Sequence, residues 1–264
     1  MPIVIPLLQP LFPGALAEHG TGLQCAPVPP HDALNLAALL DDADRLSDLL
    51  HCQAQHRGAG AGTGSGNLRA VASVWTLHYL DRLLPPVVAG ASVLQQPFPI
   101  AAQDVWVRLD RHGTVLDFHL CTLGSPMHGA STAERYADLL WQHLGPLFER
   151  LTELTRVAPK ILWGNAARRL EPILEQAMVL AGSATPAAAD RDFLLHRPHW
   201  PQPGGLPLIN PLFGPQRQVP RSAATAPLTL HRQCCLYYLL PGESHCGACP
   251  LAPQHRRAAE APQV

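Results

Sequence analysis

Four cysteines near the C-terminal end constrain this chain more than any other feature. Of its seven cysteines, four fall within one short stretch, as Cys234, Cys235, Cys246 and Cys249. Adjacent cysteines cannot form a disulfide with each other without strain. Four thiolates supplied by one short segment are typical of a zinc or iron–sulfur centre. We therefore expect this segment to fold around a metal centre, as an irregular lobe.

The missing spacer between Cys234 and Cys235 favours two metal atoms over one. Zinc ribbons usually hold their metal with two Cys-x2-4-Cys knuckles, and only Cys246-Gly-Ala-Cys249 has that form. Side chains of adjacent residues in an extended backbone point to opposite sides. Two adjacent cysteines therefore reach two atoms of a larger object more readily than one ion. The pattern favours a [2Fe–2S] cluster, and a structural zinc ion is the alternative.

Two histidines, His231 and His245, flank the motif. A histidine replaces a cysteine ligand in Rieske-type centres. Because four cysteines are already present, we interpret both histidines as residues outside the ligand set. The isolated Cys25, Cys52 and Cys121 are interpreted as small hydrophobic residues.

Composition and motifs exclude several other functions. Charged residues make up 15% of the chain and the formal net charge is −1, which argues against a nucleic-acid-binding protein. The sequence contains no His-Glu-x-x-His zinc motif, no Gly-x-Ser-x-Gly motif and no dinucleotide-binding fingerprint. The apolar start lacks the basic segment of a signal peptide, and no apolar run is long enough to span a bilayer. We therefore expect a cytoplasmic protein with reduced thiols.

Hydrophobic periodicity predicts a mainly helical domain. Apolar residues recur at helical spacing from Ala33 to Leu50, with Asp32 as the expected N-cap, and again from Leu68 to Leu83, where Pro85-Pro86 should end or break the helix. The glycine-rich stretch 58–66 between them is interpreted as a flexible linker.

The middle of the chain changes period. Residues 104–110 and 114–120 are rich in β-branched and aromatic residues around a turn, which predicts a β-hairpin. Further helices are expected after Ser131 or Thr132, over 166–180 with Asn165 as N-cap, and over 190–196, before a short strand at 227–231. The fold class is α+β, a mainly helical domain with a hairpin or small antiparallel sheet plus the irregular cluster-binding lobe. We divide the chain into a Pro-rich segment (1–30), the α+β domain (31–226), the cluster-binding motif (227–250) and a flexible tail (251–264).

The C-terminal motif resembles that of the FhuF family of siderophore-iron reductases. The stretch from His231 to Tyr238, followed by Cys246-Gly-Ala-Cys249-Pro250, carries the family's Cys-Cys-x10-Cys-x2-Cys signature. Two weaker similarities are the Trp163-Gly164-Asn165 stretch and the block from Ser73 to Pro86. The resemblance implies that Cys234, Cys235, Cys246 and Cys249 ligate a [2Fe–2S] cluster.

The resemblance also implies a function, namely the reduction of ferric iron held by imported hydroxamate siderophores. Such a protein lies in the cytoplasm, with at most peripheral contact to the inner membrane. Reduction releases the metal because chelating oxygen anions hold Fe(III) far more tightly than Fe(II). The sequence shows no flavin or nicotinamide site, so the expected electron donor is a separate protein of the ferredoxin or flavodoxin type. The alternative is a non-catalytic module that binds or senses an iron–siderophore, with a structural zinc or iron–sulfur centre.

The residues that meet the substrate are marked less clearly than the cysteines. Candidates are Arg232 and Tyr237 beside the motif, and Trp163 and Asn165 if their helix start faces the centre. Three of the four have a structural alternative: Trp163 as a core aromatic residue, Asn165 as a plain N-cap and Arg232 as a solvated charge.

Overall fold

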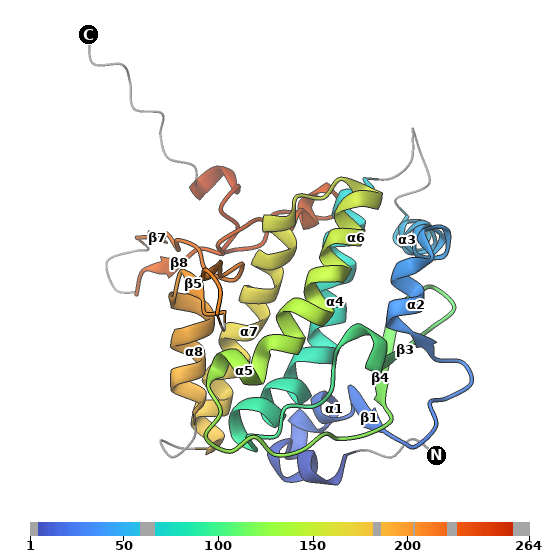
Figure 1. The fold of residues 1–264 in the computed structure, drawn as a ribbon. Helices are drawn as coiled ribbons and strands as arrows, with labels where there is room; N and C mark the ends of the chain where they lie inside the picture. The colour runs from blue at the N-terminus through green and yellow to red at the C-terminus, as the bar shows by residue number, and fades with distance from the viewer. Residues whose placement is uncertain (1–4, 59–66, 182–185, 203, 221–225, 256–264) are drawn as a thin grey trace.

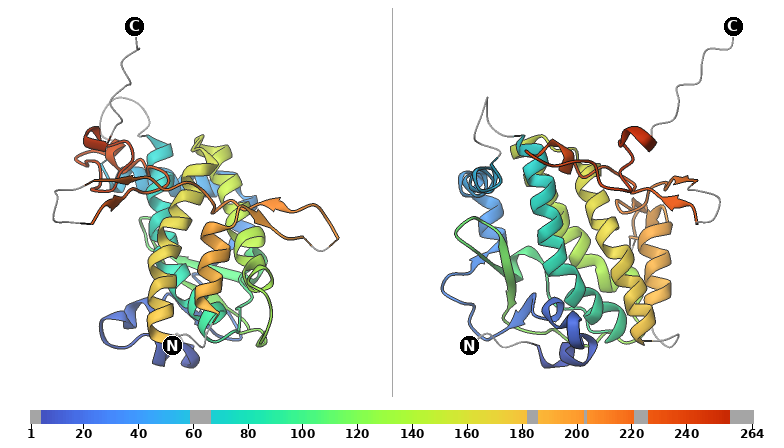
Figure 2. Two further views of the ribbon diagram at one scale, coloured as in Figure 1. Left: turned by 90° about the vertical axis from the view of Figure 1, so that its left-hand side faces the viewer. Right: turned by 180° about the vertical axis from the view of Figure 1, so that it is seen from behind.

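The structure, a computed structural model, describes residues 5–58, 67–181, 186–202, 204–220 and 226–255 (Figure 1). A layer of long helices packs beside a small sheet, and the C-terminal lobe crosses one end of the helices (Figures 1 and 2). This arrangement confirms the predicted α+β class. None of the described helices has the length and apolarity needed to cross a membrane.

The elements follow in chain order. The α-helices are α1 (Ala17–Gly20), α2 (Leu36–Asp41), α3 (Ala43–His56), α4 (Leu68–Val88), α5 (Thr132–Ala137), α6 (Gly145–Thr155), α7 (Pro159–Ala181) and α8 (Ala187–His196). Two π-helical segments are η3 (Ala89–Val93) and η5 (Asp138–Leu144), and the short 3-10 turns are η1 (Pro6–Leu11), η2 (Gly14–Leu16), η4 (Ala102–Asp104), η7 (Tyr237–Leu239) and η8 (Pro253–His255). The strands are β1 (Leu23–Cys25), β2 (Leu34–Asn35), β3 (Val105–Leu109), β4 (Val115–Leu120), β5 (His199–Trp200), β6 (Leu208–Ile209), β7 (Gln218–Val219) and β8 (Leu228–Thr229).

The predicted hairpin is confirmed as β3 and β4, the centre of a four-stranded sheet of order β1-β4-β3-β2. Its turn is closed by Asp110, whose Oδ1 accepts hydrogen bonds from the backbone N–H groups of His112 and Thr114, both at 2.8 Å. Strand β1 adds to β4 in parallel and β2 adds to β3 antiparallel. The side chains of Val105, Val107 and Phe118 are buried in the core beneath α4, because alternate residues of a strand face the same side.

Helix α4 lies at the centre of the hydrophobic core, and 16 of its 21 residues are buried. It runs unbroken through Pro85 and Pro86, where the sequence predicts an end or a break. A proline lacks an N–H, so Pro86 leaves the carbonyl of Arg82 without its helical partner. Gly22 lies against that carbonyl so closely that a Cβ atom there would come within 2.2 Å of the oxygen. Tertiary packing therefore keeps a helix that the local sequence disfavours.

Two other boundaries differ from the predictions. The helix expected from residue 33 is two helices, because Asn35 caps α2 and Asp42 caps α3 through hydrogen bonds from the N–H groups of Ala38 (3.2 Å) and Arg45 (2.9 Å). The predicted cap at Asp32 is therefore wrong. The cap at Ser131 is confirmed, and with Glu134 it forms a capping box. Helix α8 begins three residues before the predicted 190, and β8 lies within the predicted 227–231. The linker predicted at 58–66 falls, apart from Gly58, outside the described residues.

Candidate metal centre

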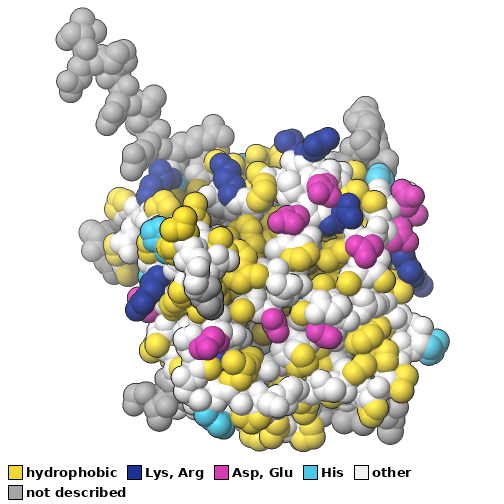
Figure 3. All heavy atoms as spheres, viewed as in Figure 1, with side chains coloured by type: hydrophobic (Ala, Val, Ile, Leu, Met, Phe, Trp, Pro, Cys, Tyr) yellow, Lys and Arg dark blue, Asp and Glu magenta, His cyan; other side chains and the backbone are white. Residues whose placement is uncertain are grey.

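The C-terminal lobe, residues 230–255, lies across the N-terminal ends of α4 and α7 (Figure 2). Its Leu240 packs against Ala70, Val71 and Val74 of α4. The Lys and Arg side chains on the face drawn in Figure 3 lie mainly toward this end of the molecule. The lobe thus rests on helix starts, whose positive dipole ends suit an anionic centre.

A buried hydrogen-bonded relay ties the lobe to both helices. The amide nitrogen of Asn165 on α7 donates to the carbonyl and to the hydroxyl oxygen of Ser73 on α4, both at 3.0 Å. The Ser73 hydroxyl in turn donates to the carbonyl oxygen of Cys235 at 2.8 Å. Asn165 is 2% exposed and sits inside α7, which begins at Pro159, so the predicted N-cap is wrong. Its side chain is instead used to hold Ser73, and through it the backbone of Cys235.

Gly164 gives the segment before the cysteines its close approach to α7. A Cβ atom at Gly164 would lie 2.7 Å from Cβ of Gln233. Only a residue without a side chain permits this contact. The Trp-Gly-Asn stretch therefore contributes a gap at Gly164 and a hydrogen-bonding group at Asn165.

The adjacent cysteines face different partners, as the missing spacer predicts. Cys234 Sγ lies 3.4 Å from Cys249 Sγ. Cys235 Sγ instead accepts a hydrogen bond from the guanidinium of Arg168 at 3.5 Å. Leu236 follows in a left-handed conformation (φ 62°), which turns its N–H back onto Cys234 Sγ at 3.4 Å. The turn at Leu236 thus provides the Cys234 sulfur with one backbone hydrogen-bond donor.

The second half of the motif is a tight knuckle. The N–H of Cys249 donates to the carbonyl of Cys246 at 3.0 Å, and the N–H of His231 donates to the carbonyl of Ala248 at 3.0 Å. Cys246 packs beside the buried Cys234 and Cys249. The knuckle is thereby held against the strand that leads into Cys234.

Two of the sulfurs, those of Cys234 and Cys246, are in surroundings that disfavour a free thiolate. Burial raises the pKa of Cys234 to about 12, although the Leu236 N–H acts in the opposite direction. Burial also raises the pKa of Cys246, which the positive charge of Arg168 partly offsets. Such thiols lose their protons when a metal centre supplies positive charge.

The donor set fits a two-iron cluster better than a single ion. All four cysteines are free thiols. Two thiolates bound to one tetrahedral metal lie about 3.8 Å apart, close to the 3.4 Å between the sulfurs of Cys234 and Cys249. A paired arrangement of soft sulfur ligands is what a [2Fe–2S] cluster uses, two for each iron.

The other predicted site residues lie around the lobe in different roles. Trp163 packs edge-to-face on Phe148, with ring centroids 4.8 Å apart, at the edge of the hydrophobic core. The Tyr237 hydroxyl donates to Glu243 at 2.8 Å on the outside of the lobe. The Arg232 guanidinium donates to the carbonyls of Gly214 (3.1 Å) and Leu195 (3.3 Å), so it anchors the lobe both to α8 and to the segment that follows it.

A polar cavity of about 690 Å³ opens beside Cys235, between α7, α8 and the β7–β8 hairpin. Five residues of α7 line it, and the other walls come from α8, the β7–β8 strands and the start of the lobe. Its charged and polar lining includes Arg168, Glu171, Glu175, Arg191, Gln216 and Arg232. Of the predicted residues only Arg232 lines this cavity. The cavity residues of α7 that the sequence analysis missed are non-apolar residues at helical spacing, namely 164, 168, 171 and 175. Hydrophobic periodicity alone assigns such a face of a helix to solvent.

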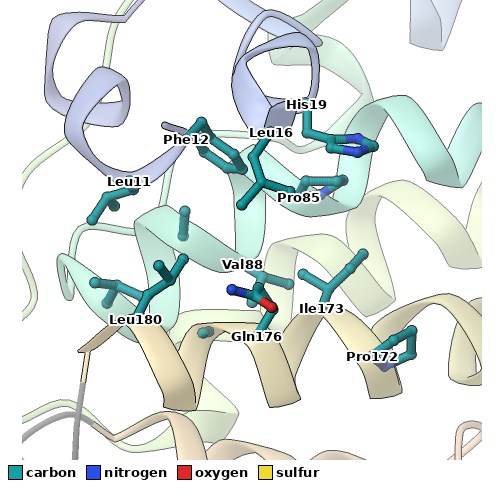
Figure 4. A pocket seen from close by; sticks show the side chains of 13 residues that line it. Leu11, Phe12, Leu16, His19, Pro85, Val88, Pro172, Ile173, Gln176 and Leu180 are labelled. Atoms are coloured by element: carbon teal, nitrogen blue, oxygen red, sulfur yellow. The ribbon is translucent and has the colours of Figure 1, made fainter. Parts of the chain in front are cut away.

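A second cavity, of about 270 Å³, is apolar and lies between η1, α4 and α7 (Figure 4). Leu11, Phe12, Val88, Ile173 and Leu180 line it, with His19 and Gln176 as its polar groups. Its lining contains none of the seven cysteines, and it offers no arginine or carboxylate to a charged ligand.

Comparisons with known proteins agree with this site. The family described as "Ferric iron reductase FhuF-like transporter" matches residues 73–226, and the "FhuF 2Fe-2S C-terminal domain" matches residues 232–251. The first match includes Ser73, Gly164, Asn165 and Arg168, and the second contains the four cysteines. No match is found among curated proteins.

Among solved structures, the fold is similar to that of aerobactin synthetase IucA from a hypervirulent pathotype of Klebsiella pneumoniae. The similarity has a TM-score of 0.52 at 13% identity and covers 69% of this chain and 38% of that one. The ATP-bound form of the same enzyme gives a TM-score of 0.54 at 14% identity, covering 69% and 37%. The chain therefore spans well under half of the synthetase. At this identity the similarity shows a shared fold.

Proposed function

Because the chain belongs to the FhuF-like family of ferric iron reductases and carries its 2Fe-2S C-terminal domain, we propose that it is a ferric-siderophore reductase. Its substrate in this proposal is Fe(III) chelated by a siderophore, hydroxamates included. The observation that carries the proposal is the set of four free cysteines in one lobe, at the spacing matched by the 2Fe-2S domain.

We assign the four ligands as Cys234, Cys235, Cys246 and Cys249. A [2Fe–2S] cluster supplies one electron at a time, which is what the conversion of Fe(III) to Fe(II) consumes. The protein contributes hydrogen bonds to the cysteine sulfurs. The N–H of Leu236 and the guanidinium of Arg168 donate to the sulfurs of Cys234 and Cys235, and such hydrogen bonds raise a cluster's reduction potential.

The backbone around the cysteines is held by the helices. The relay from Asn165 through Ser73 fixes the Cys235 carbonyl, and Gly164 lets the preceding segment lie on α7. These contacts hold the backbone that carries the sulfurs, which would limit its movement when an electron arrives or leaves.

The source of electrons and the location belong to the same proposal. A separate donor of the ferredoxin or flavodoxin type would deliver the electron, because the sequence contains no dinucleotide-binding fingerprint. The protein would act in the cytoplasm, with at most peripheral membrane contact, where imported ferric chelates arrive.

The test is a single-turnover assay without oxygen. The protein is loaded with iron and sulfide, reduced with dithionite, desalted and mixed with a ferric hydroxamate in the presence of a ferrozine trap. We expect about one Fe(II) per cluster, together with return of the oxidised visible spectrum. A Cys→Ser change at any of the four positions should remove the colour, the Fe(II) yield or both.

Two results would contradict the proposal. A colourless protein with one zinc per chain after anaerobic purification would exclude the cluster. Binding of the ferric chelate to a reduced, coloured protein without release of Fe(II) would instead indicate the alternative role of a binding or sensing module.

A further inference from the structure

The polar cavity beside Cys235 has the features of a ligand site. Its volume of about 690 Å³ falls within the range of small-molecule pockets, roughly 300–1,000 Å³. Gly164, Arg168, Glu171 and Glu175 form one wall on α7. Because these positions follow the helical repeat, they face the same side of the helix. Gln218 and Thr229 on the β7–β8 hairpin line the opposite wall.

The arginines that line the cavity outnumber the glutamates that line it. Glu175 and Glu171 lie 3.2 and 3.6 Å from the Arg191 guanidinium, and Glu171 also lies 3.7 Å from that of Arg232. Arg168 has no such carboxylate partner among the described residues, and its hydrogen bond goes to Cys235 Sγ at 3.5 Å. Among the charged side chains that line the cavity, three arginines therefore face two glutamates. Arg168 is the arginine without a carboxylate partner, and it shares its positive charge between the cavity and the Cys235 sulfur.

Arg168 lies between the cavity and the sulfur centre. One of its nitrogens contacts Cys235 Sγ, and its side chain is part of the cavity wall. A guanidinium has five N–H donors, so contact with a sulfur leaves donors for a ligand. It binds carboxylates especially well, through two parallel hydrogen bonds.

We propose that this cavity binds the ferric chelate and that Arg168 selects chelates whose periphery is negatively charged, with a free carboxylate as the preferred group. This inference rests on the proposed function and adds to it the substrate's place and charge class. The chelate would lie against the Arg168 guanidinium, whose hydrogen bond to Cys235 Sγ connects the cavity to the sulfur centre. Gln216, Gln218 and Thr229 offer neutral hydrogen-bonding groups to the amides and hydroxyls of such a chelate.

The test uses two synthetic trihydroxamates that differ only in a pendant group, a carboxylate or an ammonium. Their Ga(III) complexes report binding without electron transfer, and their Fe(III) complexes report reduction. In the cluster-loaded protein we expect tighter binding of the carboxylate form. Arg168→Gln should weaken that binding roughly 10- to 100-fold, as for loss of a charged hydrogen bond, and remove the preference, while Arg168→Lys restores part of it.

Arg169→Gln is the matched control. Arg169 directly follows Arg168 on α7, but it pairs with Asp81 at 2.8 Å and does not line the cavity. It should leave the preference between the two Ga(III) chelates intact. Thr229→Trp, which fills the cavity from β8, should weaken binding of both chelates and leave the visible spectrum unchanged.

Equal binding of the two chelates by the unaltered protein would overturn the inference, as would equal effects of Arg168→Gln and Arg169→Gln. These outcomes are separable from a failure of the proposed function. Selective Ga(III) chelate binding without Fe(II) release from the Fe(III) form would reject the reductase and keep the site. Fe(II) release without a preference between the two chelates would support the reductase and reject the proposed selectivity of Arg168.

Discussion

Ser73 on α4 and Cys235 in the C-terminal lobe are 162 positions apart, yet the serine hydroxyl donates to the cysteine carbonyl at 2.8 Å. Asn165 on α7 donates to the same hydroxyl. The two central helices and the proposed ligand are thereby joined at one buried oxygen. The lobe is tied to the helical domain through a polar contact as well as through the packing of Leu240.

Ser73→Ala should loosen the cluster. The Cys235 carbonyl would remain buried without its donor, at a cost of about 1–3 kcal/mol. We expect faster bleaching of the cluster by an iron chelator, with little change in helix content. Thr76→Val is the control, because the Thr76 hydroxyl is also buried on α4 but donates to Ala72 of the same helix at 2.7 Å. Equal bleaching rates in the two variants would show that the relay does not hold the cluster.

Gly164→Ala should reduce cluster retention although alanine favours helix by about 1 kcal/mol. The added Cβ would lie 2.7 Å from the Gln233 side chain and displace the segment before Cys234. The double variant Gly164→Ala/Gln233→Gly removes the atoms that clash and should recover the visible absorbance. Iron content per chain after purification measures both effects, and a fully loaded single variant would contradict this role of Gly164.

Asp190→Asn should destabilise the end of the molecule away from the lobe. Asp190 is fully buried and accepts from Ser92 (2.7 Å), Thr132 (2.5 Å) and Arg135. Removing its charge leaves the buried Arg135 unpaired, which costs about 3–5 kcal/mol. The free energy of unfolding, measured with urea, should fall by that order.

The control for Asp190 is Asp192→Asn on the same helix. Asp192 pairs with Arg197 at 3.3 Å, and both side chains are more than half exposed, at 59% and 62%. A surface pair of this kind contributes at most about 1 kcal/mol. Similar decreases in the free energy of unfolding in the two variants would argue against a stabilising role for the buried Asp190 and its hydrogen bonds.

His143 should make stability depend on pH. Its Nδ1–H donates to the Ile100 carbonyl (2.6 Å) and its Nε2 accepts from the Tyr79 hydroxyl (2.5 Å), so the folded protein holds it neutral. Burial lowers the pKa of His143 to about 4, from 6.5. Between these values the unfolded chain binds a proton that the folded chain does not. The free energy of unfolding therefore falls as the pH drops from 6.5 to 4, by up to about 3 kcal/mol.

The measurement compares the unaltered protein with His143→Gln, both loaded with the cluster, in urea titrations at several pH values. The difference between them cancels the acid sensitivity of the cluster. It should shrink steadily below pH 6.5, and a difference that is constant with pH would contradict the assignment.

The sequence correctly predicted those elements that depend only on residues close together in the chain. The β3–β4 hairpin and the Ser131 cap follow from alternation and from a side chain bonding its own next turn. The four cysteines were readable because their spacing alone restricts what they can bind. The helix from Leu68 was predicted, but its continuation through Pro85 and Pro86 was not, because those prolines are accommodated by Gly22 and the surrounding core.

The residues around the centre depended on distant contacts. Asn165 reads as a helix cap until Ser73 is placed beside it, and Arg168 reads as a surface charge until the lobe brings Cys235 to it. Sequence spacing cannot supply such pairings, since they are set by how α4, α7 and the lobe pack. The resemblance to a family drew attention to Trp-Gly-Asn without giving the separate tasks of Gly164 and Asn165.

The two walls of the polar cavity differ in what else they support. The α7 wall also carries Gly164 and stands next to Asn165, so most changes there disturb the seat of the lobe. The β7–β8 wall presents Gln218 and Thr229, both exposed, and neither contacts a cysteine. Redesign for a different chelate should therefore begin on the hairpin, where new shapes and charges can be tried while the helices and the lobe that hold the four cysteines are left unaltered.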